Sequence, residues 1–336
     1  MTTIAFDVMG GDYGPHVSLT AALQCLSTHP HLKLLLVGDA AVIGELLGDR
    51  FAQVQQRLQV IHAPEVISMA DKPVQAMRMK KKASMRVALE LVAEGQAQAC
   101  VSAGNTGALM ALGKVIVRTL PGIDRPAIIT RLPIEQCVTY LLDIGANVGC
   151  SADQLYQFAV MGSCLVRLLH DIPDPRVSLL NVGVEETKGN EPVRLAAQLL
   201  QGNDDINYSG FVEGDDIYKN KVNVVVCDGF VGNVALKVSE GLAAYIKNTV
   251  INAFQKVWWG RLLALLAQPV LKTIQQQLDP RYYNGASLLG LQGVVVKSHG
   301  AADALALQQA IGLAVYEVEK SIPDLLSKEL EKILVS

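Results

Sequence analysis

Short apolar runs rich in β-branched residues and leucine recur along the chain, and longer segments with a 3.6-residue repeat lie between many of them. Runs of this kind predict strands that are buried on both faces, and they cover residues 4–6, 33–37, 58–61, 99–102, 127–130, 139–142, 178–181, 222–227 and 293–296. The segments with helical periodicity are 15–27, 74–93, 108–118, 152–169, 192–201, 231–257 and 301–321. This alternation predicts a three-layer α/β/α fold with a mostly parallel sheet and helices on both of its faces.

The chain has 336 residues, a length that suits one large domain or two fused halves. It contains no internal repeat, no low-complexity stretch and no long linker, so we expect residues 1–336 to form a single domain. Two lobes that share one sheet fit the same pattern, with a boundary near residues 121–126.

Glycine turns with small polar or charged residues follow the predicted strands. Six such turns occur, at residues 7–12, 102–107, 143–147, 181–183, 228–233 and 297–300. Glycine lets the backbone approach a ligand closely, and the N-terminal amides of the following helices suit an anion. Any one turn is explained by ordinary strand-to-helix geometry, but six together predict a ligand crevice at the carboxyl ends of the strands.

Composition and charge narrow the class of protein. The chain carries 29 basic and 32 acidic side chains, a net charge of −3, and half of its residues are hydrophobic. These values exclude a disordered chain and a generally basic nucleic-acid-binding protein. A chain of this length buries a core large enough to need no disulfide or metal for stability.

The cysteines and the N-terminus indicate a cytoplasmic protein. Six cysteines lie in apolar contexts with no C-x-x-C pair and no histidine at zinc-ligand spacing, so we expect reduced core residues and no metal: Cys25, Cys100, Cys137, Cys150, Cys164 and Cys227. The alternative for Cys227 is a nucleophile. The first residues enter a strand pattern without a signal peptide, and no uncharged apolar run is long enough to span a bilayer.

Three segments carry positive charge in this acidic chain. Residues 78–86 hold five cations, which suit either a solvated helix face or an acidic partner: Arg78, Lys80, Lys81, Lys82 and Arg86. Lys188 precedes a predicted helix in a polar loop, where it is either a solvated side chain or part of a phosphate site. Residues 242–278 hold four cations and no acid on an amphipathic helical pattern, which suits an anionic membrane surface, a dimer arm, or both.

Seven sequence blocks, in order, resemble the acyl-ACP:phosphate acyltransferase family of bacterial phospholipid synthesis. They are Asp-x-Met-Gly-Gly-Asp at 7–12, Lys-Lys-x-Ser-Met-Arg at 81–86, Ser-Ala-Gly-Asn-Thr-Gly-Ala at 102–108, Leu-Asp-Ile-Gly-Ala-Asn at 142–147, the 181–191 segment, Asp-Gly-Phe-x-Gly-Asn-x-x-Leu-Lys at 228–237, and Gly-Val-Val-Val-Lys-Ser-His-Gly at 293–300. The resemblance covers about residues 3–320. Val8, Ala83 and Asn284 depart from the common family pattern.

The resemblance implies a fold like that of isopropylmalate dehydrogenases and phosphotransacetylases, with a helical arm at about residues 240–280. It implies transfer of a long-chain acyl group from acyl carrier protein to inorganic phosphate, without a cofactor, by a cytoplasmic homodimer that contacts the membrane peripherally. The acyl phosphate would pass to a downstream glycerol-3-phosphate acyltransferase. Phosphate is already an oxyanion near neutral pH, so it can attack the thioester directly once it is positioned.

We assign roles on this basis. Lys188, Gly189 and Asn190 are expected to hold phosphate, and Asn233 or Asn105 to donate a hydrogen bond to the thioester oxygen. His299 or Lys297 would stabilise the leaving group, and Asp228 would orient Lys188 or His299. The other expected substrate-binding residues are Gly10, Gly11, Thr106 and Asn147. The five cations of residues 78–86 are expected to dock the carrier protein, and the expected membrane contacts are Phe254, Trp258, Trp259, Leu262 and Leu266.

The leucines at 262–271 are candidates for the groove that receives the acyl chain. Three other functions stay open. The first is a phosphotransacetylase-like enzyme that uses a CoA thioester. The second is an NAD-dependent β-decarboxylating dehydrogenase, although no clustered aspartates suit its metal. The third is a non-catalytic membrane scaffold, which would not need six polar turns at strand ends.

Overall fold

The computed structural model describes residues 1–134 and 138–335, and these form one 11-stranded sheet with the order β3-β2-β1-β4-β11-β10-β5-β6-β9-β7-β8. The strands are β1 (Thr2–Asp7), β2 (Leu32–Gly38), β3 (Leu58–His62), β4 (Ala99–Ser102), β5 (Ala127–Arg131), β6 (Tyr140–Leu142), β7 (Val177–Leu180), β8 (Tyr208–Val212), β9 (Val224–Val226), β10 (Ala286–Leu289) and β11 (Val294–Lys297). Every strand expected from the sequence is present, and β8 and β10 are additional.

The sheet consists of two parallel groups that run in opposite directions. Strands β3, β2, β1, β4 and β11 form one group, and β6, β9, β7 and β8 form the other. Between them, β10 is antiparallel to β11 and β5, and β5 is antiparallel to β6. The mostly parallel sheet is confirmed, but the strands do not all end at one edge, as a uniformly parallel sheet would require.

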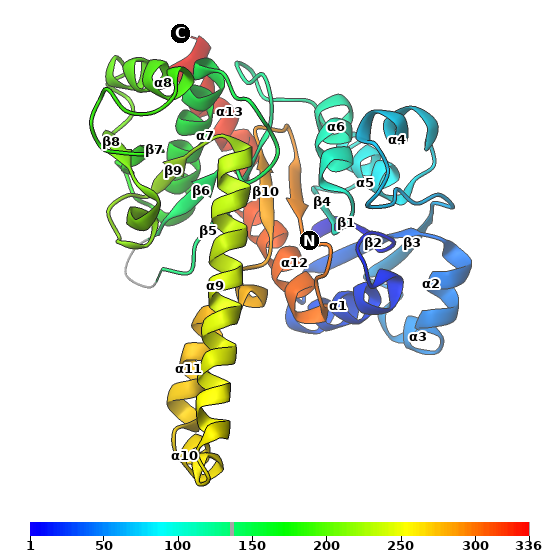
Figure 1. Cartoon of the computed structure of the whole chain (residues 1–336). Coiled ribbons are helices and arrows are strands. Elements are labelled where there is room, and N and C mark those ends of the chain that lie inside the picture. The colour runs from blue at the N-terminus through cyan, green and yellow to red at the C-terminus, as the bar shows by residue number, and fades with distance from the viewer. Residues whose placement is uncertain (135–137, 336) are drawn as a thin grey trace.

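Helices cover both faces of the sheet (Figure 1). They are α1 (Gly14–Thr28), α2 (Ala40–Leu47), α3 (Arg50–Val54), α4 (Pro73–Met79), α5 (Ser84–Ala93), α6 (Thr106–Ile116), α7 (Ala152–His170), α8 (Glu191–Gln201), α9 (Gly229–Lys256), α10 (Gly260–Leu266), α11 (Gln268–Leu278), α12 (Ala304–Glu319) and α13 (Ile322–Leu330), with short turns η1 (Gly214–Tyr218), η2 (Pro280–Tyr283) and η3 (Glu331–Val335). On β1, Ile4 and Phe6 pack with α1 and α12, whereas Ala5 packs with α5 on the opposite face. This alternation gives the three layers.

The single helix expected over residues 74–93 is two helices, α4 and α5. The break at residues 80–83 has a local cause, because Ala83 forms an isolated parallel bridge with Glu65. The amide of Lys82 donates to the Glu65 carboxylate at 2.7 Å, and the amide of Ser84 donates to the Glu65 carbonyl at 3.0 Å. Contacts distant in sequence therefore override the helical periodicity.

Two strands, β8 and β10, are not predicted by the pattern of apolar runs, for different reasons. Strand β10 has the sequence Ala-Ser-Leu-Leu, which contains no β-branched residue, although all four positions are buried. Strand β8 lies at the edge of the sheet, is only partly buried and contains Gly210 at a φ of +82°. Neither strand has the apolar, β-branched run on which the prediction depends.

The five cysteines that the structure describes are free and buried, and Cys137 lies outside the described residues. Burial raises the pKa of the Cys227 thiol well above its usual value, and the nearby carboxylates of Asp143 and Asp228 raise it further. The thiolate that a nucleophile needs is therefore disfavoured. Cys227 is a core residue, as expected.

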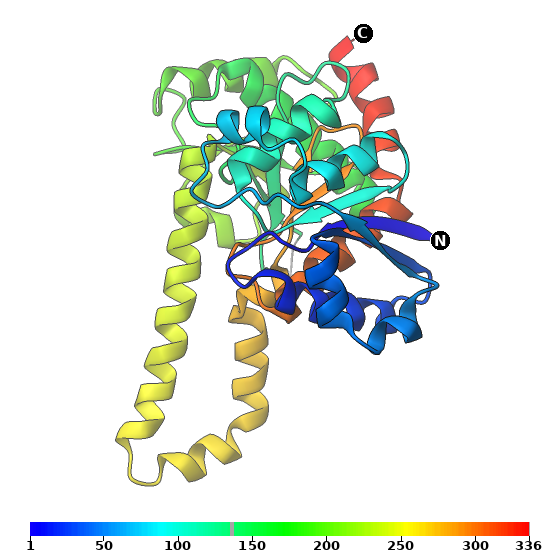
Figure 2. The same cartoon turned by 90° about the vertical axis from the view of Figure 1, so that its right-hand side faces the viewer.

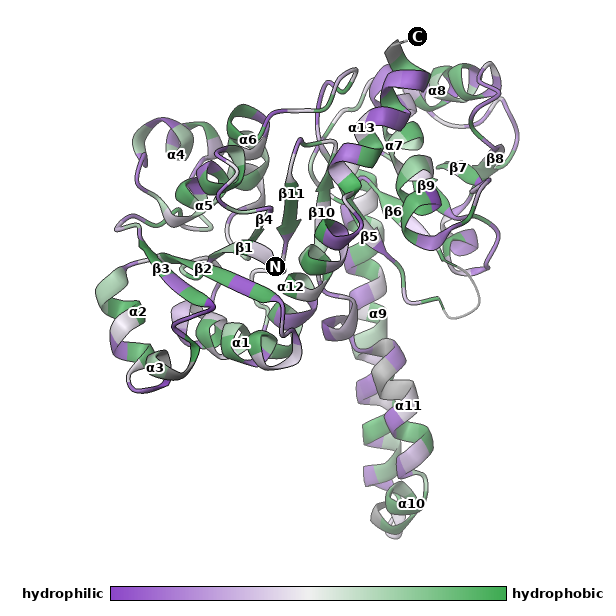
Figure 3. Ribbon diagram, turned by 180° about the vertical axis from the view of Figure 1, so that it is seen from behind, coloured by the Kyte–Doolittle hydropathy of each residue, from purple (hydrophilic) through white to green (hydrophobic). Residues whose placement is uncertain are grey.

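A helical arm projects from the body of the molecule (Figures 1 and 2). Helix α9 has 28 residues, which corresponds to about 42 Å at 1.5 Å per residue. Helix α10 forms the tip, and α11 returns toward the body. The hydropathy colouring mixes polar and apolar positions along the arm (Figure 3). Within the described parts of the chain, no helix combines the length and the apolar character that crossing a membrane requires.

Two glycines in the first turn of α9 set the position of the arm. Asp143 lies in the turn after β6, and a Cβ on Gly232 would overlap its carbonyl oxygen and lie 2.9 Å from the Sγ of Cys227. A Cβ on Gly229 would likewise overlap the carbonyl oxygen of Asn147. The helix therefore packs directly against the backbone of this turn.

We predict opposite effects of Gly→Ala substitution at two positions of α9. Gly232→Ala should lower the free energy of unfolding by about 3 kcal/mol, because the new methyl group meets backbone atoms that cannot move aside. Gly241→Ala, where a Cβ would meet nothing within 4 Å, should raise it by about 0.5–1 kcal/mol. Urea unfolding of both variants measures the difference, and equal stability of Gly232→Ala and the wild type would contradict this packing.

Candidate functional site

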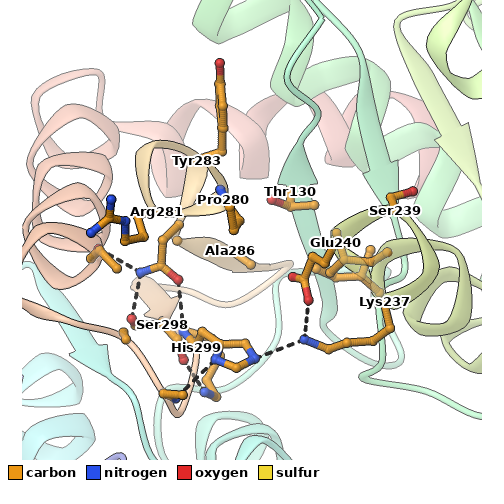
Figure 4. A pocket seen from close by; sticks show the side chains of 18 of the residues that line it. Thr130, Lys237, Ser239, Glu240, Pro280, Arg281, Tyr283, Ala286, Ser298 and His299 are labelled. Atoms are coloured by element: carbon orange, nitrogen blue, oxygen red, sulfur yellow. Dashed lines mark hydrogen bonds and ion pairs between the residues drawn. The ribbon is translucent and has the colours of Figure 1, made fainter. Parts of the chain in front are cut away.

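A cavity of about 1020 Å³ lies between the inner face of α9, the sheet and the turns at the strand ends (Figure 4). Five of the six glycine turns contribute a lining residue: Asp12, Thr106, Ile144, Asn233 and the 297–300 turn. The turn at 181–183 does not reach it. The expected crevice therefore exists, although its turns come from both oppositely directed strand groups.

Lys297 lies at the end of β11 and is 8% exposed. Its ammonium group donates to the carbonyl oxygens of Ala103, at 3.3 Å, and of Ser298. An ammonium group has three protons, so one remains for a ligand in the cavity. Burial lowers the pKa of Lys297 to about 8, against the opposing influence of Asp7 and Asp12.

Lys237 and His299 are in contact with each other at the cavity wall (Figure 4). The Nζ of Lys237 lies 3.0 Å from the Nε2 of His299 and donates to the Glu240 carboxylate at 2.7 Å. The amide of Ala301 lies 3.1 Å from the Nδ1 of His299. A neutral imidazole has one unprotonated nitrogen, so it accepts only one of these two donors at a time. Burial and the Lys237 charge lower the pKa of His299, which favours this neutral form.

The turn that carries His299 is anchored by Asn284, one of the departures from the family pattern. The Asn284 amide group donates to the hydroxyl of Ser298 and to the carbonyl of Ala306, both at 2.7 Å. Its side-chain oxygen accepts the amide of His299 at 3.1 Å. Asn284 therefore fixes the turn by three hydrogen bonds.

A buried carboxylate lies beneath this polar end. Asp7 is 1% exposed, and its Oδ2 accepts the Ser102 hydroxyl at 2.7 Å, while its Oδ1 has no hydrogen-bond partner. Burial raises its pKa, and the hydroxyls of Ser84 and Ser102 oppose that rise. The two glycines expected to bind substrate shape the turn above it: a Cβ on Gly10 would lie 2.8 Å from the Asp7 carboxylate, and Gly11 has a φ of +90°. Neither glycine lines the cavity.

Three other expected site residues have structural roles. Asn105 caps α6 through the amide of Ala108, and its amide group donates to three carbonyls of the 68–71 loop, so no donor remains for a thioester. Asn147 is 3% exposed and donates to Asp143 and to Pro126. Asp228 caps α9 through the amide of Phe230 and accepts the amide of Cys150. It therefore orients neither Lys188 nor His299.

The structure does not bring Lys188, Gly189 or Asn190 into the cavity. Asn190 caps α8 through the amide of Val193, and Asn181 donates to the carbonyl of Lys188 at 3.2 Å. These residues follow β7, which lies outside β9 in the sheet, next to the edge strand. The sequence shows that a turn follows a strand, but it does not show the position of that strand in the sheet.

Asn233, Thr106, Lys297 and His299 are the expected site residues that line the cavity. Lys237 also lines the cavity, although the sequence predicts no role for it within the 228–237 block. The signal was its spacing, because residues four apart lie on one face of a helix, which places Lys237 beside Asn233. Asp12 was also missed as a cavity residue, although it ends the first glycine turn.

The cations of residues 78–86 divide into paired and unpaired groups. Lys80 contacts Asp71 at 2.5 Å, and Arg86 contacts Glu90 at 2.7 Å, so these two cations support the local fold. Arg78, Lys81 and Lys82 are exposed. They lie close in sequence to the 68–71 loop, whose Met69 lines the cavity.

The arm tip exposes most of the apolar residues expected at a membrane. Trp258 is 94% exposed, and Leu262 and Leu266 are 58% and 72% exposed. Trp259 is exposed, and Phe254 is half-buried within α9. Helix α10 lies at the end of the arm (Figure 2). No residue of 262–271, the segment expected to hold an acyl chain, lines this cavity.

Comparison with known proteins places these features in a family. A family profile described as "Fatty acid synthesis protein" matches residues 2–324. Phosphate acyltransferases from Shewanella baltica and Shewanella woodyi are each 52% identical to this chain over 334 residues, which cover 99% of this chain and 98% of each relative.

Solved structures support the fold. A phosphotransacetylase from Streptococcus pyogenes has a TM-score of 0.61 at 19% identity, over 98% of this chain and 94% of that chain. A 4-hydroxythreonine-4-phosphate dehydrogenase from Salmonella typhimurium has a TM-score of 0.55 at 14% identity, over 94% of this chain and 99% of that chain. The expected likeness to phosphotransacetylases and to a dehydrogenase fold is therefore confirmed. The two phosphate acyltransferases align with almost the whole chain and are identical to it at about half of the aligned positions. The chain therefore belongs to the phosphate acyltransferase family and is an acyltransferase.

Proposed function

We propose that this chain transfers a long-chain acyl group from acyl carrier protein to inorganic phosphate and so supplies an acyl phosphate for phospholipid synthesis. The observation that carries the proposal is a cavity with two lysine ammonium groups at one end and largely apolar walls beyond them. The cationic end suits a phosphate dianion, and the apolar walls suit a hydrocarbon chain.

We infer that phosphate binds between Lys237 and Lys297. Both ammonium groups line the same cavity, and the charge of Lys237 adds to burial in lowering the pKa of Lys297, so the two cations repel each other. An anion between them relieves this repulsion, and the free proton of Lys297 donates to it. His299 lies beside the same position as a neutral polar group.

The reaction needs no covalent intermediate with the protein. A phosphate oxygen forms a bond to the thioester carbon, the C–S bond breaks, and the carrier leaves as a thiolate that then takes up a proton. The side chain of Asn233 lines the cavity and makes no hydrogen bond within the described residues, so its amide group is available for the thioester oxygen. Because a thiol has a pKa near 8.5, the thiolate leaves readily near neutral pH.

The exposed cations Arg78, Lys81 and Lys82 are proposed to dock the acidic carrier protein. The exposed tip residues around Trp258 are proposed to contact an anionic membrane, since Lys256 and Lys272 on the arm are also exposed. Peripheral contact of a cytoplasmic protein would place the acyl phosphate near a glycerol-3-phosphate acyltransferase in the membrane.

A homodimer is proposed through the outer face of α9. Val231, Val234, Val238 and Tyr245 are exposed along this helix, between 44% and 68%. Their spacing of three, four and seven residues places them in one stripe, on the side of α9 opposite the cavity. An apolar stripe of this kind suits a second copy of the same helix.

The first prediction from this proposed function concerns the reaction itself. The purified protein should release free thiol from palmitoyl-carrier protein only when phosphate is present, with initial rates that indicate a ternary complex. Ping-pong kinetics or an isolable acyl-enzyme would contradict direct attack. Turnover of palmitoyl-CoA without turnover of the carrier thioester would instead favour the phosphotransacetylase-like activity.

The second prediction concerns Lys297. Lys297→Met should raise the KM for phosphate at pH 7 by about 10–150-fold, as expected for a lost charged hydrogen bond of about 1.5–3 kcal/mol. The ratio of variant to wild-type KM should fall toward one as the pH rises through about 8, since the wild-type lysine then loses its charge. Ionisation of phosphate affects both proteins equally, so the ratio isolates the lysine.

Lys188→Met is the control for this experiment and should leave the KM for phosphate within about twofold. If the KM for phosphate rose strongly in Lys188→Met but not in Lys297→Met, the phosphate site would instead be the turn after β7.

The third prediction concerns the carrier protein. Reversing Lys81 and Lys82 to glutamate should raise the KM for acyl-carrier protein and flatten its dependence on salt, without changing the KM for phosphate. The matched control reverses Lys328 and Lys332, which lie in the C-terminal helices α13 and η3. Equal effects of the two pairs would indicate a general effect of charge and would remove the docking site from residues 81–82.

A further inference from the structure

The face of α9 that lines the cavity changes character along the helix. Near the cationic end its polar members Asn233, Lys237 and Glu240 lie around Leu236, and farther toward the arm its members are the apolar Leu242, Ala243 and Ile246. The rise of a helix places Ile246 about 20 Å beyond Asn233, toward the arm. The cavity therefore has a long apolar side that begins at the reacting groups.

The wall that faces α9 is formed where the chain returns from the arm to the body, after α11. Pro280 and Tyr283 of η2 line it, together with Gln277 at the end of α11. Thr130 of β5 and Ala286 of β10 lie between this wall and α9 (Figure 4). Side chains distant in sequence thus line one channel, which is partly open to solvent at Ile246.

Ion pairs lie along this channel, and the exposed Arg131 also lines it. Arg281 contacts Asp279 at 2.6 Å and Asp303 at 2.9 Å, and Glu240 accepts from Lys237 at 2.7 Å. Between these charged groups, the apolar side chains offer a surface for a hydrocarbon ligand. A hydrocarbon chain has no hydrogen bonds to water to give up when it lies against such a surface. A charged group on the ligand would lose its hydration there without gaining a partner.

We propose that the acyl chain of the donor runs along α9 from the cationic end past Ala243 toward Ile246, and that the small side chain of Ala243 sets the chain length the enzyme accepts. This inference rests on the proposed function, because it takes the thioester to lie at the cationic end. Ala243 is the smallest of the cavity-lining α9 side chains. It lies one turn beyond Glu240, so a short chain ends before it and a long chain must pass it.

The test is Ala243→Trp, assayed with butyryl and palmitoyl groups on the same carrier protein. The indole fills the channel beyond the reacting groups, so kcat/KM for the palmitoyl donor should fall at least about tenfold. The value for the butyryl donor should stay within about twofold. Ala243→Leu should give a smaller loss with the same selectivity, and it covers the case in which the tryptophan variant does not fold.

The matched control is Ala244→Trp, at the next position of the same helix. Ala244 is exposed and does not line the cavity. This variant should keep the wild-type ratio of palmitoyl to butyryl activity. It therefore separates a blocked channel from a general disturbance of α9 by a bulky side chain.

The outcomes are distinct. Selective loss of the palmitoyl donor in the Ala243 variants supports the channel. Equal loss of activity with both donors, or no loss with either, overturns the channel. The proposed function stands in that case, because it depends on the activity of the wild type. If the wild type releases thiol from neither donor, the proposed function fails, and palmitate binding measured by calorimetry tests the channel alone. Unchanged palmitate affinity in Ala243→Trp would then overturn it.

Discussion

The site depends on one close backbone approach, between the first turn of α9 and the turn that follows β6. Gly229 and Gly232 let the helix lie directly on the carbonyl oxygens of Asn147 and Asp143. Asp143 holds its side of the contact, because its carboxylate accepts the amides of Ile128, Gly145, Ala146 and Asn147 and the side-chain amide of Asn147. This contact sets the direction of α9, which in turn aims Lys237 at His299 and carries the arm away from the body.

The polar end of the cavity combines fixed and adjustable parts. Lys297 is held by carbonyl oxygens, and the 297–300 turn is held by Asn284, so these groups keep their positions without a ligand. The Lys237 and His299 pair depends on the protonation state of an imidazole and on the Glu240 carboxylate. In a site of this kind, preorganised donors hold an anion. The hydrogen bond between Lys237 and His299 changes when the imidazole gains or loses a proton.

Most of the sheet is predictable from the sequence. Strands such as β1, β4, β9 and β11 are buried on both faces, so they need apolar residues at successive positions, and these continuous runs are visible in the sequence. The sequence pattern missed β10, whose pairing depends on neighbours on both sides, and it joined α4 to α5, since the contact of Glu65 with Ala83 is nonlocal. For the site, Lys297, His299 and Asn233 were found from their turns. Lys188 was expected beside them because strand order, which places β7 beyond β9, is not encoded locally.

The order of strands in the sheet also bears on how the chain is made. The central strands β10 and β11 come from residues 286–297, yet they lie between β4 and β5, which are synthesised much earlier. Until they emerge, the facing edges of β4 and β5 carry unpaired backbone groups, which are templates for association with other chains. The two halves of the sheet therefore join only near the end of translation, which makes late-stage truncation products of this chain prone to aggregation.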